Sequence, residues 1–123
     1  MKHIWFFIIT LFSSVNTFSQ NTIKLEDAAK HIGDSVLVCG KVADAAFVET
    51  MENSPTFLNL GAPYPDQLLN LVIWIDQRDQ YNPAPETFYV NKNVCVTGKI
   101  EMINDFPEMV IHNKRQIKVT DQP

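Results

Sequence analysis

Few residues of this chain could carry out chemistry, and those few are far apart in the sequence. The cysteines are Cys39 and Cys95, and the histidines are His3, His31 and His112. Two cysteines can form a structural disulfide, stay free as thiols, bind a metal or act as a redox pair. A metal site needs more ligands than two cysteines and distant histidines supply, and a redox pair usually has CxxC spacing. These residues predict no metal site, and the state of the cysteines then depends on the fold and the compartment.

Catalytic motifs are absent from the sequence. It contains no nucleophile elbow, no HExxH pair and no glycine-rich phosphate loop. Asp76 and Asp79 could contribute to a calcium site, but an EF-hand-like array of ligands is missing, and a solvated turn is the simpler interpretation. His31 is expected to lie in the last turn of a short helix, where it has a capping role. The sequence therefore predicts a protein that is not an enzyme and needs no cofactor.

Length and composition predict one globular domain. The chain has 123 residues, of which 46% are hydrophobic and 20% charged, and its formal net charge is −4. The apolar content excludes a disordered chain, and two cysteines are too few for a disulfide-rich scaffold. An excess of acid argues against a nonspecific nucleic-acid binder that is held by phosphate contacts.

The first nineteen residues have the layout of a secretory signal peptide. Lys2 precedes an apolar run over 4–12, and Thr17 and Ser19 occupy the −3 and −1 positions of a cut before Gln20. The run is about half of the roughly 20 residues that a spanning helix needs, although a retained membrane anchor is the alternative. We predict a signal peptide over 1–19 and a domain over 20–123 that is exported to the periplasm or outside the cell, where cysteines can pair.

In the rest of the chain, short segments with alternating apolar and polar residues are typical of β-strands. Acids early, bases late and a following Gly33 predict one short helix over 25–32. A single helical turn is expected over 85–89, in a crossover between the third and fourth strands. We expect Ile117 and Val119 to extend the strand pairing made by the last predicted strand. Period-two alternation predicts strands over 35–48, 56–60, 68–76, 94–101 and 108–112.

A faint internal repeat suggests a closed barrel. Val38-Cys39-Gly40-Lys41-Val42 in the first strand is similar to Val96-Thr97-Gly98-Lys99-Ile100 in the fourth. Glycine inside a strand usually marks a bulge or a sharp bend. Two strands with a matching glycine would form two corners of one small barrel, unless the similarity is a coincidence.

Several phrases resemble those of small exported bacterial domains with the oligonucleotide/oligosaccharide-binding fold (OB-fold). The phrases are His31-Ile32-Gly33-Asp34-Ser35-Val36, Thr56-Phe57-Leu58-Asn59-Leu60-Gly61, Pro63-Tyr64-Pro65 and Val94-Cys95-Val96-Thr97-Gly98-Lys99-Ile100. The resemblance covers about residues 23–119. It implies an all-β, five-stranded OB-fold-like Greek-key barrel with one short N-terminal helix. Some of these domains stand alone and others accompany extracellular nucleases, so the family implies a binding module and no activity.

The barrel makes a specific expectation about the cysteines. In an OB-fold the first and fourth strands are antiparallel neighbours. With valines inward, Cys39 and Cys95 both point outward from adjacent strands, where two cysteines can meet. The resemblance therefore favours a structural disulfide between them over free thiols, a metal pair or a redox pair.

An OB-fold binds its ligands across the second and third strands and the loops beside them. If Leu58, Leu60, Leu71, Ile73 and Ile75 point inward, the opposite face carries aromatic and amide side chains that could stack on bases or sugars. Packing is the alternative for Phe57 and Trp74. The candidate ligand-binding residues are Phe57, Asn59, Asn70, Trp74 and Phe106.

The distribution of charge argues against nucleic-acid binding at this face. Acids stand in both flanking loops and at the end of the third strand. The candidates for phosphate contacts are scattered: Arg78, Lys99, Lys114 and Arg115. The sequence therefore predicts an exported noncatalytic OB-fold binding module for single-stranded nucleic acid. The alternative is a protein-interaction or envelope-associated structural module that binds no nucleic acid.

Overall fold

The computed structural model describes residues 21–121. The predicted signal peptide over 1–19 lies outside the described residues. In the described part of the chain, no helix is long and apolar enough to cross a membrane.

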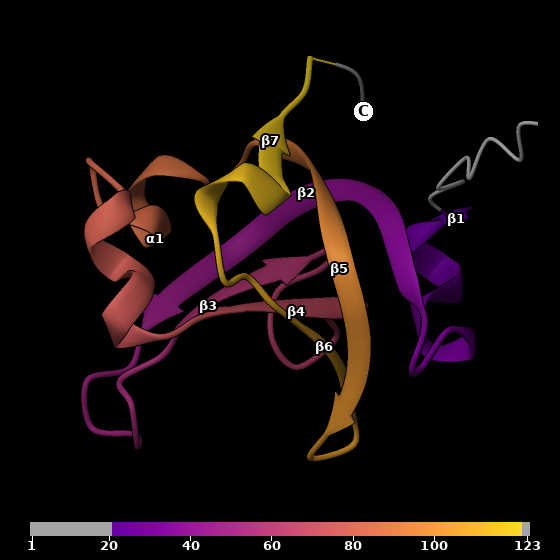
Figure 1. Cartoon of the computed structure of the whole chain (residues 1–123), viewed down its shortest axis with the longest axis horizontal. Helices are drawn as coiled ribbons and strands as arrows, with labels where there is room; N and C mark the ends of the chain where they lie inside the picture. Colours follow the sequence, from indigo (N-terminus) through magenta and orange to yellow (C-terminus); the bar gives the residue numbers. More distant parts are fainter. Residues whose placement is uncertain (1–20, 122–123) are drawn as a thin grey trace, which may run out of the picture.

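The described chain is mostly β-structure, with four short helical segments (Figure 1). The helical segments are the 3-10 helices η1 (Leu25–Lys30), η2 (Ile75–Gln80) and η3 (Lys114–Gln116) and the α-helix α1 (Pro85–Phe88). The strands are β1 (Asn21–Ile23), β2 (Ser35–Phe47), β3 (Thr56–Leu60), β4 (Leu69–Ile73), β5 (Asn93–Ile103), β6 (Phe106–Val110) and β7 (Ile117–Val119).

Strand pairing closes a five-stranded barrel. The strands follow the order β2-β3-β4-β6-β5, and β5 pairs again with β2. All these pairs are antiparallel except β4 with β6. This is the closed Greek-key order of the OB-fold, and it confirms the predicted fold class. Two further strands sit at the edges: β1 pairs parallel with β2, and β7 pairs antiparallel with β5.

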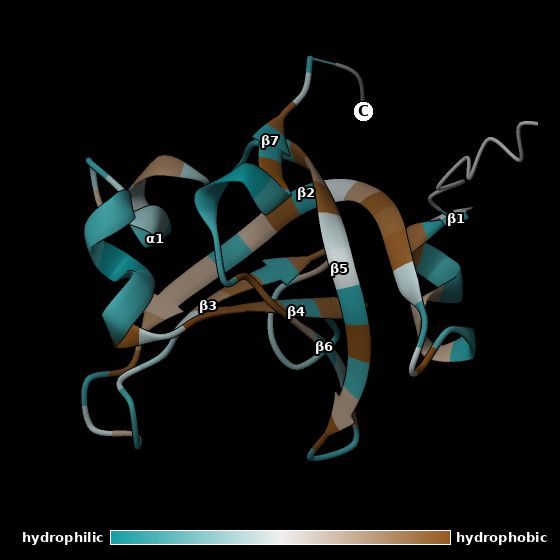
Figure 2. Ribbon diagram, viewed as in Figure 1, coloured by the Kyte–Doolittle hydropathy of each residue, from teal (hydrophilic) through white to brown (hydrophobic). Residues whose placement is uncertain are grey.

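The core follows the alternation seen in the sequence. Val36, Val38 and Val42 of β2 are buried, and so are the alternate apolar residues of β5. Figure 2 shows polar and apolar bands following one another along β5, whereas the first part of β2 is apolar on both faces. The repeated glycines allow close packing at the corners. A Cβ atom on Gly40 would lie 2.6 Å from Leu25 Cδ2, and one on Gly98 would lie 2.9 Å from Met109 Cγ.

The two ends of the barrel are covered by helical segments that lie on opposite sides of it (Figure 1). At one side, Leu25 and Ala28 of η1 are buried in the core. At the other, α1 packs against β2 and β3, and the rings of Tyr81 and Tyr89 meet edge to face with their centroids 6.0 Å apart. These covers leave the outer surface of the strands as the place for a ligand.

The predicted disulfide is confirmed. Cys39 of β2 and Cys95 of β5 are register partners, and their sulfur atoms are 2.05 Å apart. Both side chains leave the outer side of the barrel, because the neighbouring valines fill the inside. The disulfide therefore joins the two strands whose pairing closes the ring.

The third and fifth predicted strands differ from the observed ones. β4 ends at Ile73, three residues before the predicted end, and η2 begins at Ile75. Ile75 was expected to point inward but is 45% exposed, because the chain has left the strand there. β6 begins at Phe106, two residues earlier than predicted, because Asn104 and Asp105 both have positive φ and complete the turn in two residues.

Candidate ligand-binding face

A row of polar side chains crosses the outer surface of all five barrel strands. Asp44 of β2 pairs with Asn59 of β3, which pairs with Asn70 of β4. Asn70 in turn pairs with Glu108 of β6, and Glu108 with Glu101 of β5. We call these five residues the polar row. They lie on one face because each is the register partner of the next.

The two predicted asparagines are held inside this row. Asn59 donates from Nδ2 to Asp44 Oδ1 at 2.7 Å, and the other oxygen of Asp44 accepts from the backbone N–H of Tyr64 at 3.3 Å. The side chain of Asn70 bonds to Glu108. Asn59 and Asn70 are each only 6% exposed. Their side chains are enclosed by the neighbouring strands, so neither is available to contact a ligand.

Glu108 is the member of the polar row whose negative charge is least favourable. Its side chain is only 9% exposed, and the carboxylate of Glu101 stands directly opposite on the next strand. Burial first, and then the negative charge of Glu101, raise the pKa of Glu108 above its usual 4.5, against the hydrogen bond from Asn70. The buried oxygen Oδ1 of Asn70 has no hydrogen-bond partner among the described residues. An ionised carboxylate cannot donate to it.

We expect Glu108→Gln to raise the free energy of unfolding at pH 7 by about 0.5 kcal/mol, the scale of a like-charge cross-strand pair. The glutamine removes the repulsion from Glu101 and offers an N–H to Asn70 Oδ1. Because the folded pKa is raised, the benefit of protonating Glu108 is fully present below the unfolded pKa and is lost as the pH rises through the folded pKa. Urea titrations at pH 4 and pH 7 measure both effects. The exposed Glu52→Gln is the matched control, and a less stable E108Q protein at pH 7 would contradict the expectation.

Trp74 is the aromatic residue that a ligand can reach on one side of the polar row. Its ring is half-buried between two open depressions of about 240 and 270 Å³. Lys99 and His112 line the first depression, together with Glu101, and Asp76 lines the second. Trp74 therefore borders one depression that holds both a cation and a carboxylate and a second that holds a carboxylate.

The other predicted aromatic residues separate into two groups. Phe57 is half-buried and pairs with Val72, which is fully buried, on the same side of the polar row as Trp74. Phe106 begins β6 on the far side of the row. Its ring centroid lies 6.3 Å from that of Tyr64, which is 68% exposed. The predicted site residues thus do not form one cluster, because the polar row divides them.

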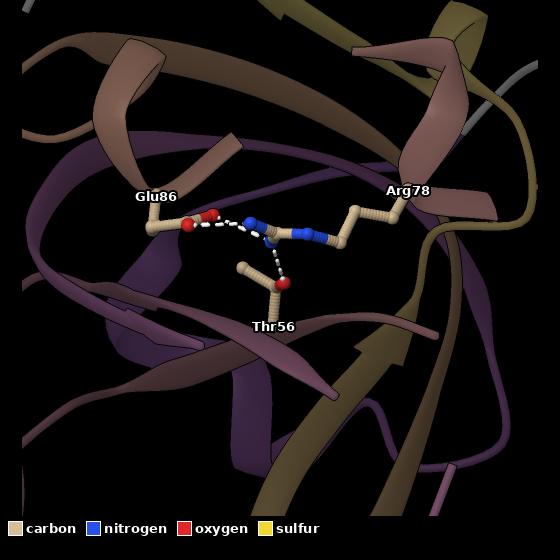
Figure 3. A network of polar contacts seen from close by, with 3 residues as sticks. All are labelled: Thr56, Arg78 and Glu86. Atoms are coloured by element: carbon tan, nitrogen blue, oxygen red, sulfur yellow. Dashed lines mark hydrogen bonds and ion pairs between the residues drawn. The ribbon is translucent and has the colours of Figure 1, made fainter. Parts of the chain in front are cut away.

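Arg78 is the predicted phosphate contact that the structure places elsewhere. Its guanidinium bonds to both carboxylate oxygens of Glu86 and to the hydroxyl of Thr56 (Figure 3). It also lies 3.8 Å from the centre of the Phe47 ring. These contacts use the side chain at the end of the barrel and remove it from the candidate face.

Gln116 and Lys118 were missed by the sequence reasoning. Gln116 donates from Nε2 to the carbonyl of Thr97 at 2.9 Å, and its Oε1 accepts from the backbone N–H groups of His112 and Asn113. It lies where β5 changes partner, since residues 94–96 of β5 pair with β7 and residues 100–103 pair with β6. Lys118 is the register partner of Cys95. The alternation of Ile117 and Val119 was a signal that Lys118 points outward.

Comparison with known proteins gives distant structural matches. No family model and no curated protein matches the chain. A solved structure described as an aspartyl-tRNA synthetase from Leishmania major Friedlin aligns with 88% of this chain and 22% of that chain, at 11% identity and a TM-score of 0.49. The S. pombe Stn1-ten1 complex aligns with 72% of this chain and 60% of that chain, at 18% identity and a TM-score of 0.48. This chain spans less than two thirds of either. The fold assignment rests on the strand order, and membership of an exported bacterial family stays a prediction.

Proposed function

We propose that the protein is an exported, noncatalytic OB-fold module that binds single-stranded nucleic acid on the outer face of β3, β4 and β6. The observation that supports this most is the position of Trp74. Trp74 directly follows β4, one of the strands where OB-folds take their ligands, and it borders two depressions, one of which Lys99 also lines. A base stacked on the ring would have its phosphate within reach of a cation.

The energetics of this contact are modest. Stacking one base on an aromatic side chain is worth about 1–3 kcal/mol. The carboxylates Glu101 and Asp76 border the same ring and oppose phosphate binding. We therefore expect weak binding that is strongest at low salt and that tolerates different base sequences.

Export is supported by two independent features. The predicted signal peptide over 1–19 directs the chain out of the cytoplasm. The disulfide between Cys39 and Cys95 forms and persists in an oxidising compartment. Both fit a domain that works in the periplasm or outside the cell.

Substitution of Trp74 tests the proposal. We expect Trp74→Ala to weaken binding of fluorescein-labelled dT4 at 20 mM salt about tenfold, which corresponds to about 1.4 kcal/mol of stacking energy. Trp74→Phe, which keeps a ring, should lose less than half of that free energy. Ile32→Ala, at an exposed apolar residue two positions after η1, is the control. Wild-type protein that binds no oligonucleotide at low salt, or a W74A variant that binds as well as wild type, would remove the proposal.

A protein-interaction module is the second candidate function. The acid excess favours it, and so do Met51 and Ile75, which are 48% and 45% exposed. Ile75 borders a depression beside Trp74, and its backbone N–H bonds to Asn53 of the loop that also carries Met51. A protein partner would bury these apolar side chains. A protein-interaction function is favoured if wild-type protein binds no oligonucleotide at low salt.

A further inference from the structure

A second surface on the barrel is basic although the chain is acidic. An open groove of about 600 Å³ lies on the outer side of β2, β5, β7 and η3. Leu37, Cys95 and Thr97 form its strand-borne part, and Arg115 and Lys118 are its charged residues. No carboxylate among the described residues lines the groove, while the chain as a whole carries a net charge of −4. The local charge therefore favours an anion.

Both cations of this basic groove are available. Within residues 21–121, no hydrogen bond or ion pair uses the terminal nitrogens of Arg115 or the amine of Lys118. Asn113 Oδ1 accepts from the backbone N–H of Arg115 at 2.8 Å and from its Nε at 3.3 Å. This contact fixes the base of the arginine side chain and leaves its outer fork for a ligand, such as a phosphate that accepts two hydrogen bonds.

The basic groove adjoins the depression beside Trp74. Gln116 lines both. Its side chain is fixed by hydrogen bonds to four backbone groups, of Thr97, Val110, His112 and Asn113, so it forms a rigid divider between the two surfaces. Lys99 lies in the depression on one side of the divider, and Arg115 and Lys118 lie in the groove on the other. A cationic path therefore leads away from the Trp74 ring, on the side away from the polar row.

We propose that a single strand bound at Trp74 continues past Gln116 into the basic groove, where Arg115 and Lys118 contact its phosphates. This inference rests on the proposed function, since Trp74 sets where the strand begins. The groove supplies the phosphate contacts that the acidic face of the polar row lacks. Leu37 and the sulfur of Cys95 give the sugars and bases an apolar surface, and Thr97 offers a hydroxyl. The footprint then exceeds that of the Trp74 depression alone, within the 4–16 nucleotides per domain of OB-folds.

A comparison of oligonucleotide lengths tests this path. Labelled dT4 and dT12 are titrated at salt concentrations from 20 to 200 mM with wild type, Arg115→Gln/Lys118→Gln and the control Lys24→Gln/Lys30→Gln. The control makes the same change in net charge on exposed lysines at and beside η1, neither of which lines the groove. Each phosphate contact to a single strand adds about 0.7 to the slope of log K against log salt. We expect the R115Q/K118Q variant to lose about 1.4 of the slope and about tenfold in affinity for dT12, and to bind dT4 within twofold of wild type.

Each outcome bears on one of the two proposals. If wild type binds neither oligonucleotide, the proposed function and the basic-groove path both fail. If wild type binds dT4 but gains nothing with dT12, or if both double variants lose dT12 affinity equally, the path through the groove fails and the Trp74 site remains. If R115Q/K118Q weakens dT12 while W74A does not, the groove binds the strand and Trp74 is the wrong anchor. Thermal unfolding midpoints within about 2 °C of wild type show that the variants are folded.

Discussion

Replacing Cys39 and Cys95 together by serine is expected to lower the free energy of unfolding by about 4 kcal/mol. The disulfide closes a loop with a sequence separation of 56, and in the chain-entropy model a loop of this length restricts the unfolded chain by about that amount. The native structure should change little, because Cys39 is exposed and serine keeps a small side chain there. This makes the disulfide a large single contribution for a domain of this size.

Urea unfolding of wild type and the Cys39→Ser/Cys95→Ser variant, each with and without dithiothreitol, measures this effect. Reductant should bring the wild type to the stability of the variant and leave the variant unchanged. Mass spectrometry after alkylation without reductant should find no labelled thiol in wild type. A loss below about 1 kcal/mol would mean that native β2–β5 pairing already persists in the unfolded chain.

Strand alternation explains why the barrel could be predicted from the sequence. The strands β2 to β5 place mostly valine, leucine or isoleucine at every second position, and the outward positions between them differ in polarity. Gly40 and Gly98 interrupt this pattern where Leu25 and Met109 approach the backbone. The parity of Cys39 and Cys95 then follows from the same alternation, once the first and fourth strands are neighbours. The short β1 could not be seen, since three residues with a polar start show no period and depend on pairing with β2.

The candidate site was harder to predict because side-chain exposure depends on the register. Asn59 and Asn70 point outward from the barrel, as the alternation predicts. Alternation along one strand does not identify the residue that faces each of them on the neighbouring strand. Asp44 and Glu108 are their partners across the strands and remove them from solvent. Trp74 remained reachable because β4 ends one residue before it. Two of the five predicted residues are therefore enclosed by polar neighbours that lie 15 and 38 positions away in the sequence.

Arg78 likewise shows that the sequence does not reveal which charged side chains are already paired within the fold. A solvated arginine at the end of a strand is an ordinary expectation for phosphate contact. In the structure it joins three elements, because η2 brings it over Thr56 of β3 and α1 brings Glu86 to its outer edge (Figure 3). The side chains of Arg78 and Glu86 are only 20% and 23% exposed. The network fastens the crossover between β4 and β5 to the barrel.

Arg78→Met is expected to lower the free energy of unfolding by about 2 kcal/mol, between the range for an exposed ion pair and that for a fully buried one. Methionine keeps the packing on Phe47 but leaves the carboxylate of Glu86 and the hydroxyl of Thr56 without their donor. Arg78→Lys should recover part of the loss, since lysine keeps the charge but not the two parallel bonds. Arg115→Met, on an exposed arginine, is the matched control and should change stability by less than about 0.5 kcal/mol.

The pH dependence separates the ion pair from simple packing. Hydrogen bonds from Arg78 are the main cause that holds the pKa of Glu86 below its usual 4.5. A lowered folded pKa means that the contribution of Glu86 is present above the unfolded pKa and is lost as the pH falls through the folded pKa. Wild type should therefore lose more stability than R78M between pH 5 and pH 2. Adding Glu86→Gln to R78M should cost less than Glu86→Gln costs in wild type, because the second carboxylate has no partner left to lose. Equal losses in the two backgrounds would show that Arg78 does not stabilise the fold through Glu86.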